Sequence, residues 1–373
     1  MKAQKIDRIN VAVTGLNSSQ SPSPGIGVVH SLKMDSSARI SIIALAYDRF
    51  SDGLHSLSLA DQVVELPFPQ HQPEQFFQRL ASLSSKMRIH CLIPTIDAEV
   101  SAISRMGADL VKLGIRVLLP EEESLKKISK ERLAGGGPFK TFSLPFSAVI
   151  YSRNDLLHYS RNLRFPLILK GPLGEAHQAS SLMEAGVYFD SLAKSWGTPI
   201  ILQSVIQGEE YAVACLASQR HEAIGLVAMK KIIQDDGGTT WAGITVQEQE
   251  LNQIARKLLE HFKWVGPLEM EFIKEAASGR YYLIEINNRF PAWIYLATRA
   301  GQNMPLAYLK LALGKKIKPF EGYQSGMLYV RVADDLVTDL GSLAGLMTKG
   351  EWNCHEKREK GSLRKTYHRP QFS

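Results

Sequence analysis

The chain has 373 residues and a formal net charge of +7, from 44 Lys and Arg against 37 Asp and Glu. This length is too great for one ordinary hydrophobic core, so we expect two or three domains. The sequence has no apolar run of membrane-spanning length and no secretory leader at its start, and its three cysteines lie far apart, which excludes a paired-cysteine metal site. We therefore expect a cytoplasmic protein with no membrane partner.

The basic balance favours anionic ligands such as nucleotides. Part of the excess lies in the last segment, EKREKGSLRKTYHRPQFS, which contains no nucleic-acid-binding motif. We therefore do not expect nucleic acid as a partner, and we interpret this segment as a C-terminal extension.

The first third of the chain alternates apolar strands with helical stretches. Strands are expected at residues 9–14, 40–46, 63–66, 88–94 and 115–119. This alternation predicts a parallel sheet covered by helices on both faces. The loop at 15–27 contains glycines and two prolines but lacks the GxGxxG spacing. An NAD site is therefore the weak interpretation, and a structural or substrate-contacting domain is the favoured one.

The middle of the chain places a lysine at the end of an apolar strand. Residues 165–170, FPLILK, lead into the turn KGPLG. Lys170 either extends along the surface to solvent or directs its charge at a phosphate. A helix is expected over 179–196, followed by the strand ILQSVI, the turn QGEEY and a second strand, YAVACLA.

Residues 268–289, LEMEFIKEAASGRYYLIEINNR, read as a β-hairpin with a turn at Ser278-Gly279. Strand alternation places Glu269 and Glu271 on one face, and Glu285 and Asn287 on one face of the returning strand. If the two polar faces coincide, carboxylates converge, and two of them about 5 Å apart repel by about 3 kcal/mol at an effective dielectric of 20. An all-oxygen set of this kind suits Mg²⁺. The alternative is a hairpin with one solvated face.

Six features follow one another in a recognisable order. They are a lysine on a helix, a lysine on a strand, an apolar strand entering a GxE turn, a Glu-Phe pair, an ExN motif and a nearby arginine: Lys130, Lys170, ILQSVIQGEE, Glu271-Phe272, Glu285 with Asn287, and Arg289. This order resembles the ATP-grasp superfamily. PTIDAE at 94–99 and TWAGITV at 240–246 are similar to its carbamoyl-phosphate synthetase branch, which includes small stand-alone ligases.

The resemblance implies a role for each matching residue. Lys130 and Lys170 would bind the α- and β-phosphates of ATP, and Glu210 would hold the ribose. The adenine pocket would be lined by Gln203, Ser204 and Ile206. The ligands of Mg²⁺, with Mn²⁺ as an alternative ion, would be Glu271, Glu285 and Asn287. Arg289 would contact the transferring phosphoryl group or the acyl phosphate, and Lys231 the γ-phosphate, although strand parity alone does not separate Lys231 from Lys230.

Two departures from the family pattern concern the nucleotide. The lid loop at 171–177 contains Pro172, which lacks an N–H, and an additional acid, Glu175, and both weaken a phosphate cradle. The hinge position often held by glutamate is Gln203, whose amide carbonyl still accepts a hydrogen bond.

The expected fold is α/β: an N-terminal parallel α/β (pre-ATP-grasp) domain over 1–121, then a two-lobed ATP-grasp α+β domain over 122–320 with its lid at about 140–203. A C-terminal strand and basic tail fill 321–373.

The implied activity is that of an ADP-forming ligase, which uses ATP and Mg²⁺ to activate a small-molecule carboxylate as an acyl phosphate for attack by an amine. The alternatives are an enzyme that phosphorylates bicarbonate or carbamate, and a non-catalytic ATP-binding module. A homodimer is left open.

Overall fold

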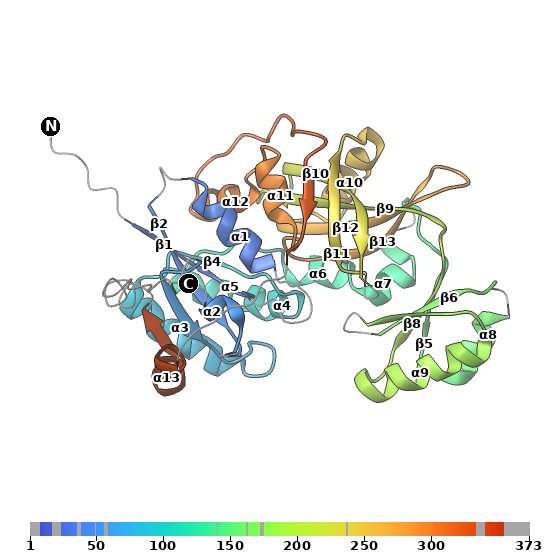
Figure 1. The fold of residues 1–373 in the computed structure, drawn as a ribbon, viewed down its shortest axis with the longest axis horizontal. Coiled ribbons are helices and arrows are strands. Elements are labelled where there is room, and N and C mark those ends of the chain that lie inside the picture. The colour runs from blue at the N-terminus through green and yellow to red at the C-terminus, as the bar shows by residue number, and fades with distance from the viewer. Residues whose placement is uncertain are drawn as a thin grey trace, which may run out of the picture. The chain divides into compact units, whose positions relative to one another are not determined.

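The structure is a computed structural model, and it describes residues 8–16, 24–35, 39–48, 50–55, 59–139, 141–161, 163–171, 175–235, 238–332 and 340–353. The chain forms two compact units (Figure 1). The first contains Met1–Ala102, Met106–Val117 and Asp334–Ser373, and the second contains Ile103–Arg105 and Leu118–Ala333.

The first unit is built on a sheet whose strand order is β15-β3-β2-β1-β4. Four of these strands are parallel, namely β1 (Ile9–Val13), β2 (Ile40–Ala46), β3 (Gln62–Glu65) and β4 (Cys91–Ile93), and β15 (Glu351–Asn353) pairs antiparallel with β3. The near-continuous apolar run of β2 is buried, as is typical of a parallel strand covered on both faces. Helices in this part of the chain are α1 (Pro24–Lys33), α2 (Asp52–His55), α3 (Pro73–Met87), α4 (Asp97–Arg105), α5 (Gly107–Lys112) and α13 (Leu340–Lys349).

One predicted strand is wrong. The apolar run at 115–119 makes an isolated parallel bridge between Arg116 and Cys91 and does not form a strand. The N–H of Leu118 donates to the hydroxyl of Tyr308 at 2.9 Å, so a side chain takes the place of a ladder partner. The glycine- and proline-containing loop at 15–27 lies partly outside the described residues, as does the basic tail after residue 353.

The second unit contains a six-stranded antiparallel sheet in the order β13-β12-β9-β10-β11-β14. Its strands are β9 (Gly208–Ala217), β10 (Ala223–Gln234), β11 (Thr240–Val246), β12 (Gly266–Glu275), β13 (Tyr281–Asn287) and β14 (Leu328–Val330). Helix α10 (Gln249–His261) packs on β9 and β10, and α11 (Ile294–Arg299) and α12 (Met304–Ala312) follow β13. The C-terminal strand predicted within 321–373 is confirmed as β14 at the edge of this sheet.

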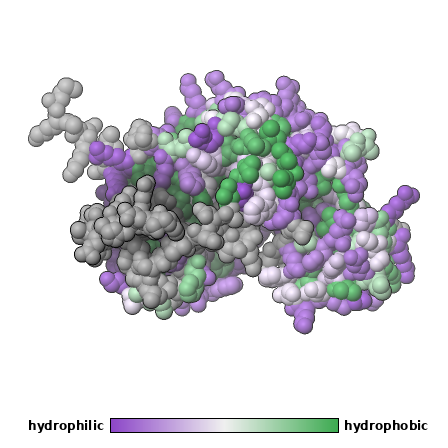
Figure 2. Space-filling model, viewed as in Figure 1, coloured by the Kyte–Doolittle hydropathy of each residue, from purple (hydrophilic) through white to green (hydrophobic). Residues whose placement is uncertain are grey.

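Apolar side chains gather on the visible face of the second unit (Figure 2). Edge strand β14 contributes to the exposed apolar surface, because Leu328 and Val330 are each 60% exposed.

The same unit holds a smaller antiparallel sheet, hereafter the lid, in the order β5-β8-β6-β7. Its strands are β5 (Ser147–Ile150), β6 (Leu167–Lys170), β7 (Ala176–Ala179) and β8 (Ile200–Ser204), and its helices are α8 (Arg153–Ser160) and α9 (Leu182–Trp196). Its own apolar core includes Ile150, Leu169 and Leu202, all fully buried. Ahead of the lid come α6 (Glu122–Lys127), α7 (Lys130–Ala134) and the short 3₁₀ helix η1 (Gly137–Phe139). A parallel sheet followed by two antiparallel lobes confirms the predicted fold class.

Candidate active site

Two carboxylates face each other across the β12–β13 hairpin. Strand alternation buries Leu268, Met270 and Phe272 of β12 on the opposite face, leaving the acidic residues between them on the other. The strand register then pairs Glu269 with Asn287 and Glu271 with Glu285. The polar faces of the two strands therefore coincide, a point that alternation within each strand left open.

A buried lysine from a third strand reaches this pair. The side chain of Lys231 on β10 is 3% exposed, and its Nζ lies 2.6 Å from Glu271 Oε2 and 3.4 Å from Glu210 Oε2. Lys230 points to the other face, where its Nζ contacts Glu209 at 2.6 Å. The structure thus places Lys231 with the carboxylates, a choice that sequence parity left open.

Two further lysines lie near the second carboxylate, that of Glu285. Lys130 at the start of α7 places its Nζ 3.4 Å from Glu285 Oε1. Lys170 at the end of β6 donates to the carbonyl oxygen of Ile284 at 3.4 Å. A cavity of about 20 Å³ lies between these groups, and Gln203 also lines it. This volume admits a single water-sized molecule and is too small for a nucleotide.

The electrostatics of the cluster follow from its burial. Burial, together with the neighbouring charges of Glu269 and Glu285, raises the pKa of Glu271 to about 7 even though Lys231 opposes the shift. Burial also acts to raise the pKa of Glu285, but Lys130 and Lys170 outweigh it and bring that pKa below its ordinary value.

The lysines are perturbed in opposite directions. Burial lowers the pKa of Lys170, a shift that nearby Glu285 only partly offsets. Burial likewise acts to lower the pKa of Lys231, but the carboxylates of Glu271 and Glu210 outweigh it, so this pKa lies above its usual range. Lys231 is therefore a permanently charged partner of the carboxylate pair at neutral pH.

The donor set fits Mg²⁺ better than a metal held entirely by protein. Glu271 and Glu285 both contact cationic groups, and Asn287 Nδ2 donates to Glu269 at 3.2 Å and to Glu271 at 3.4 Å. In the described part of the chain, no group of three or more His, Cys, Asp or Glu side chains is arranged to hold a metal ion. Mg²⁺ is usually bound by one or two carboxylates and takes its other ligands from water and substrate phosphates, which matches this set.

The hinge residues predicted from the sequence are brought to the end of β8 and the loop after it. Gln203 is 5% exposed and donates from Nε2 to Ser147 Oγ at 3.0 Å. Ser204 and Ile206 are half-buried, and of the three only Gln203 is among the residues that line the small cavity. The connection to β9 is tight, because a Cβ on Gly208 would stand 2.0 Å from the carbonyl oxygen of Lys274.

The additional acid of the lid loop is bound within the lid itself. Glu175 accepts from Trp196 Nε1 at 2.7 Å and contacts His177 Nε2 at 2.8 Å. Its backbone carbonyl accepts from the N–H of Gly171 at 2.7 Å. Residues 172–174, including Pro172, lie outside the described residues. The carboxylate of Glu175 is therefore engaged by lid residues.

Sequence reasoning gave Glu269 no role, yet it is a centre of contacts beside the carboxylate pair. Arg289 Nη1 donates to Glu269 Oε2 at 2.9 Å, and Trp293 Nε1 donates to Glu269 Oε1 at 2.8 Å. Arg289 also helps to lower the pKa of Glu285. The predicted arginine is thus close to the pair and held by a neighbouring acid. The alternation that places Glu269 beside Glu271 was the available signal for this contact.

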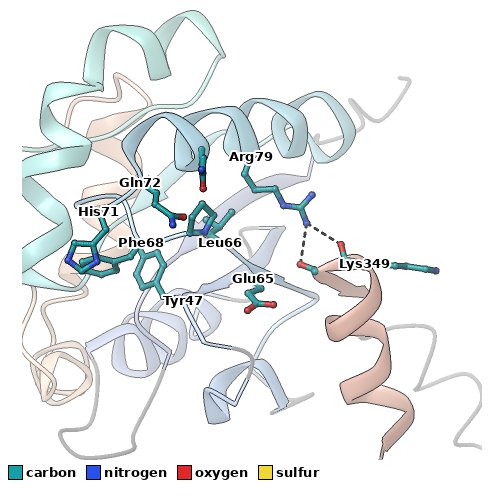
Figure 3. A pocket seen from close by; sticks show the side chains of 11 residues that line it. Tyr47, Glu65, Leu66, Phe68, His71, Gln72, Arg79 and Lys349 are labelled. Atoms are coloured by element: carbon teal, nitrogen blue, oxygen red, sulfur yellow. Dashed lines mark hydrogen bonds between the residues drawn. The ribbon is translucent and has the colours of Figure 1, made fainter.

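A larger hollow of about 620 Å³ lies elsewhere, in the first unit (Figure 3). Tyr47, Phe68 and His71 lie at one end of it and Arg79 at the other. Arg79 donates to the carbonyl oxygen of Lys349, the last residue of α13, at 3.4 Å and to that of Gly350, just after the helix, at 3.2 Å, and so ties the end of α13 to α3. None of the site residues predicted from the sequence lines this hollow.

The family model described as ATP-grasp in the biosynthetic pathway with Ter operon matches residues 197–334, which span β8 to β14 and include both carboxylates. The segment from β8 to β14 therefore matches the ATP-grasp superfamily.

Sequence and structure comparisons agree with this assignment. D-alanine–D-alanine ligase B of Pseudomonas syringae pv. tomato is 29% identical over 159 residues, which is 38% of this chain and 48% of that protein. The chain thus spans about half the length of this curated relative.

Among solved structures, the biotin carboxylase–β,γ-ATP complex of Campylobacter jejuni has a TM-score of 0.66 at 13% identity, over 86% of this chain and 74% of that one. The biotin carboxylase domain dimer of Hydrogenobacter thermophilus 2-oxoglutarate carboxylase, with MgADP, ADP and bicarbonate, has a TM-score of 0.65 at 14% identity, over 83% and 71% of the two chains. Both similarities concern the fold. Among the described helices, none has the length and apolar character needed to cross a membrane.

Proposed function

We propose that this ATP-grasp protein is an ATP- and Mg²⁺-dependent ligase that joins a small-molecule carboxylate to an amine and releases ADP and phosphate. The observation that carries the proposal is the cluster on the six-stranded sheet. Glu271 and Glu285 are register partners, and Lys231 and Lys130 lie within 4 Å of them. Catalysis of phosphoryl transfer depends mainly on positioning the reactants and neutralising the phosphate charge, and the charged side chains of this cluster are suited to both.

Each side chain has a task in this proposal. Lys130 and Lys170 hold the α- and β-phosphates, and Lys231 is directed at the γ-phosphate. Adenine lies against the hinge residues Gln203, Ser204 and Ile206, and Glu210 takes the ribose hydroxyls. Glu271, Glu285 and Asn287 hold Mg²⁺, or Mn²⁺ in its place, which when bound neutralises phosphate charge and eases approach of a carboxylate.

The reaction proceeds in two displacements. A carboxylate oxygen of the acid forms a bond to the γ-phosphorus, the bond from that phosphorus to the bridging oxygen breaks, and ADP leaves. The amine nitrogen then bonds to the acyl carbon, the carbon–oxygen bond to the phosphate breaks, and the nitrogen loses a proton to solvent. Arg289, whose fork of donors matches a phosphoryl group or a carboxylate, holds the acyl phosphate between the two steps.

The setting and the assembly state complete the proposal. Among the described cysteines, Cys91 and Cys215 are free and buried, which supports a reducing, cytoplasmic location. The Hydrogenobacter neighbour is a dimer, so a homodimer is the assembly to test by sedimentation equilibrium.

Isotope transfer tests the reaction. Candidate acids labelled with ¹⁸O in the carboxylate are incubated with MgATP and a panel of amines, and the products are analysed by mass spectrometry. The proposal predicts ADP, an amide and inorganic phosphate that carries one ¹⁸O from the acid. AMP and pyrophosphate as products would contradict it.

Two other outcomes separate the alternatives. The Hydrogenobacter neighbour was crystallised with bicarbonate, so ATP turnover stimulated by bicarbonate and independent of amine would favour the phosphorylating enzyme. Tight ATP binding with no turnover at saturating Mg²⁺ would favour the non-catalytic module.

A further inference from the structure

We propose that Glu269 is a positioning residue for the metal and phosphoryl groups. Its buried carboxylate does not hold the metal ion; it fixes the donor groups of Asn287, Arg289 and Trp293 around the carboxylate pair. This inference rests on the proposed function, because it assigns Glu269 a part in the same site.

Three donors occupy this carboxylate. Oε2 accepts from Asn287 Nδ2 at 3.2 Å and from Arg289 Nη1 at 2.9 Å, while Oε1 accepts from Trp293 Nε1 at 2.8 Å. The side chain is 7% exposed. An ionised carboxylate has about four acceptor positions, so most of this group's capacity is already used. About one acceptor position, on Oε1, remains, so a metal ion at Glu269 would compete with these three donors for the carboxylate.

The hydrogen bond to Glu269 helps to fix the orientation of the Asn287 side-chain amide. Its Nδ2 is shared between Glu269 and Glu271, which leaves the amide oxygen as the group able to meet a cation. Partners that orient a metal ligand in this way contribute about 10–100-fold to metal affinity.

Arg289 is held in the same manner. Its Nη1 donates to Glu269 and also to the carbonyl oxygen of Phe290 at 3.2 Å, so the guanidinium is set before a substrate arrives. One carboxylate thus orients the metal side and the acyl-phosphate side of the site together. Trp293, which follows Arg289 in the chain, ties the start of α11 to the same group.

Calorimetric titration with ADP tests the role, with excess Mg²⁺ in one series and EDTA in the other. For Glu269→Gln, we expect MgADP to bind about 10–100-fold more weakly while metal-free ADP binds within about twofold of wild type. Glu269→Asp keeps the charge but withdraws the carboxylate by one methylene from its three donors. Positioning predicts that Glu269→Asp behaves like Glu269→Gln.

The opposite results would overturn the inference. If Glu269→Asp binds MgADP like wild type, Glu269 acts through its charge alone. If MgADP and metal-free ADP lose affinity equally, its role is only structural. A wild-type protein that binds no MgADP would instead contradict the proposed function, so the two failures are distinguishable.

A second variant keeps the test open if the Glu269 variants do not fold. Asn287→Asp adds a charged oxygen ligand but removes the N–H donated to Glu269. Positioning by Glu269 predicts weaker Mg²⁺-dependent binding of ADP in this variant, again by about 10-fold or more. Tighter Mg²⁺-dependent binding would show that the contact with Glu269 is dispensable.

Discussion

Replacing Lys231 with methionine in the metal-free protein tests how much the charge of Lys231 contributes to the free energy of unfolding. The Nζ of Lys231 lies 2.6 Å from Glu271 Oε2, and its side chain is 3% exposed. At that separation the attraction between unit charges is about 6 kcal/mol at an effective dielectric of about 20. The variant no longer has to desolvate the ammonium group, and this offsets part of the lost attraction. Removing one partner of a buried ion pair therefore lowers the free energy of unfolding by about 3–5 kcal/mol.

The loss depends on pH because Glu271 titrates near neutrality. Its folded pKa of about 7 lies above the ordinary value of 4.5, so this group's stabilising contribution is complete below pH 4.5 and is lost as pH rises toward 7. Removing Lys231 raises the folded pKa further and extends the loss to higher pH. Lys231→Met should therefore lose about 3–5 kcal/mol at about pH 8 and about 1 kcal/mol at about pH 5.5, where Glu271 is protonated in both proteins.

Urea denaturation with EDTA present, at both pH values, measures this difference. Lys230→Met is the matched control, because the Lys230 and Glu209 side chains are 35% and 56% exposed and such pairs contribute little. We expect that control to stay within about 0.5 kcal/mol of wild type. An equal loss in the two variants, or a Lys231→Met deficit that does not change with pH, would show that the Lys231–Glu271 ion pair does not set the stability of the site.

Three further predictions concern the nucleotide site and its supports. Glu285→Gln should lower the rate of ADP release by about 10²–10³ without changing the thermal midpoint by more than a few degrees, and near-normal turnover would contradict its assigned role. Trp196→Phe removes the donor to Glu175 and should weaken the hold on the strand that follows, seen as faster hydrogen exchange in β7; unchanged exchange would show that the contact is dispensable. Gly208→Ala places a Cβ 2.0 Å from the carbonyl oxygen of Lys274, so β9 and β12 must separate there, and calorimetry should show weaker ADP binding together with a lower thermal midpoint.

Local patterns predicted the elements whose hydrophobic periodicity is complete. β2 occupies the expected residues 40–46, and the hairpin expected at 268–289 forms from β12 and β13 over residues 266–287. In both cases side-chain alternation or a continuous apolar run reflects how the strand is buried.

The features that escaped prediction depend on partners far along the chain. The run at 115–119 is as apolar as a strand, but the backbone N–H of Leu118 donates to the hydroxyl of Tyr308 and not to a neighbouring strand. β15 completes the first sheet by pairing with β3, and nothing within residues 351–353 indicates that neighbour. Strand alternation does not show which of Lys230 and Lys231 faces the carboxylates, because the register of β10 is irregular after Lys231. This irregularity leaves the consecutive residues Ile232 and Ile233 both exposed.

The sequence predicts which residues lie together at the site but not the contacts among them, and their chemical roles stay predictions. Residue types and order pointed to Glu271, Glu285 and Asn287, whereas the shared contacts of Glu269 with Arg289 and Trp293 required the geometry of the turn after β13.

The most direct test is a crystal structure with Mn²⁺ and a non-hydrolysable ATP analogue. We predict one anomalous peak from Mn²⁺, about 2.1 Å from carboxylate oxygens of both Glu271 and Glu285, with the polyphosphate between Lys130, Lys170 and Lys231. A cation bound elsewhere, with Lys231 and Lys130 still in contact with Glu271 and Glu285, would contradict it.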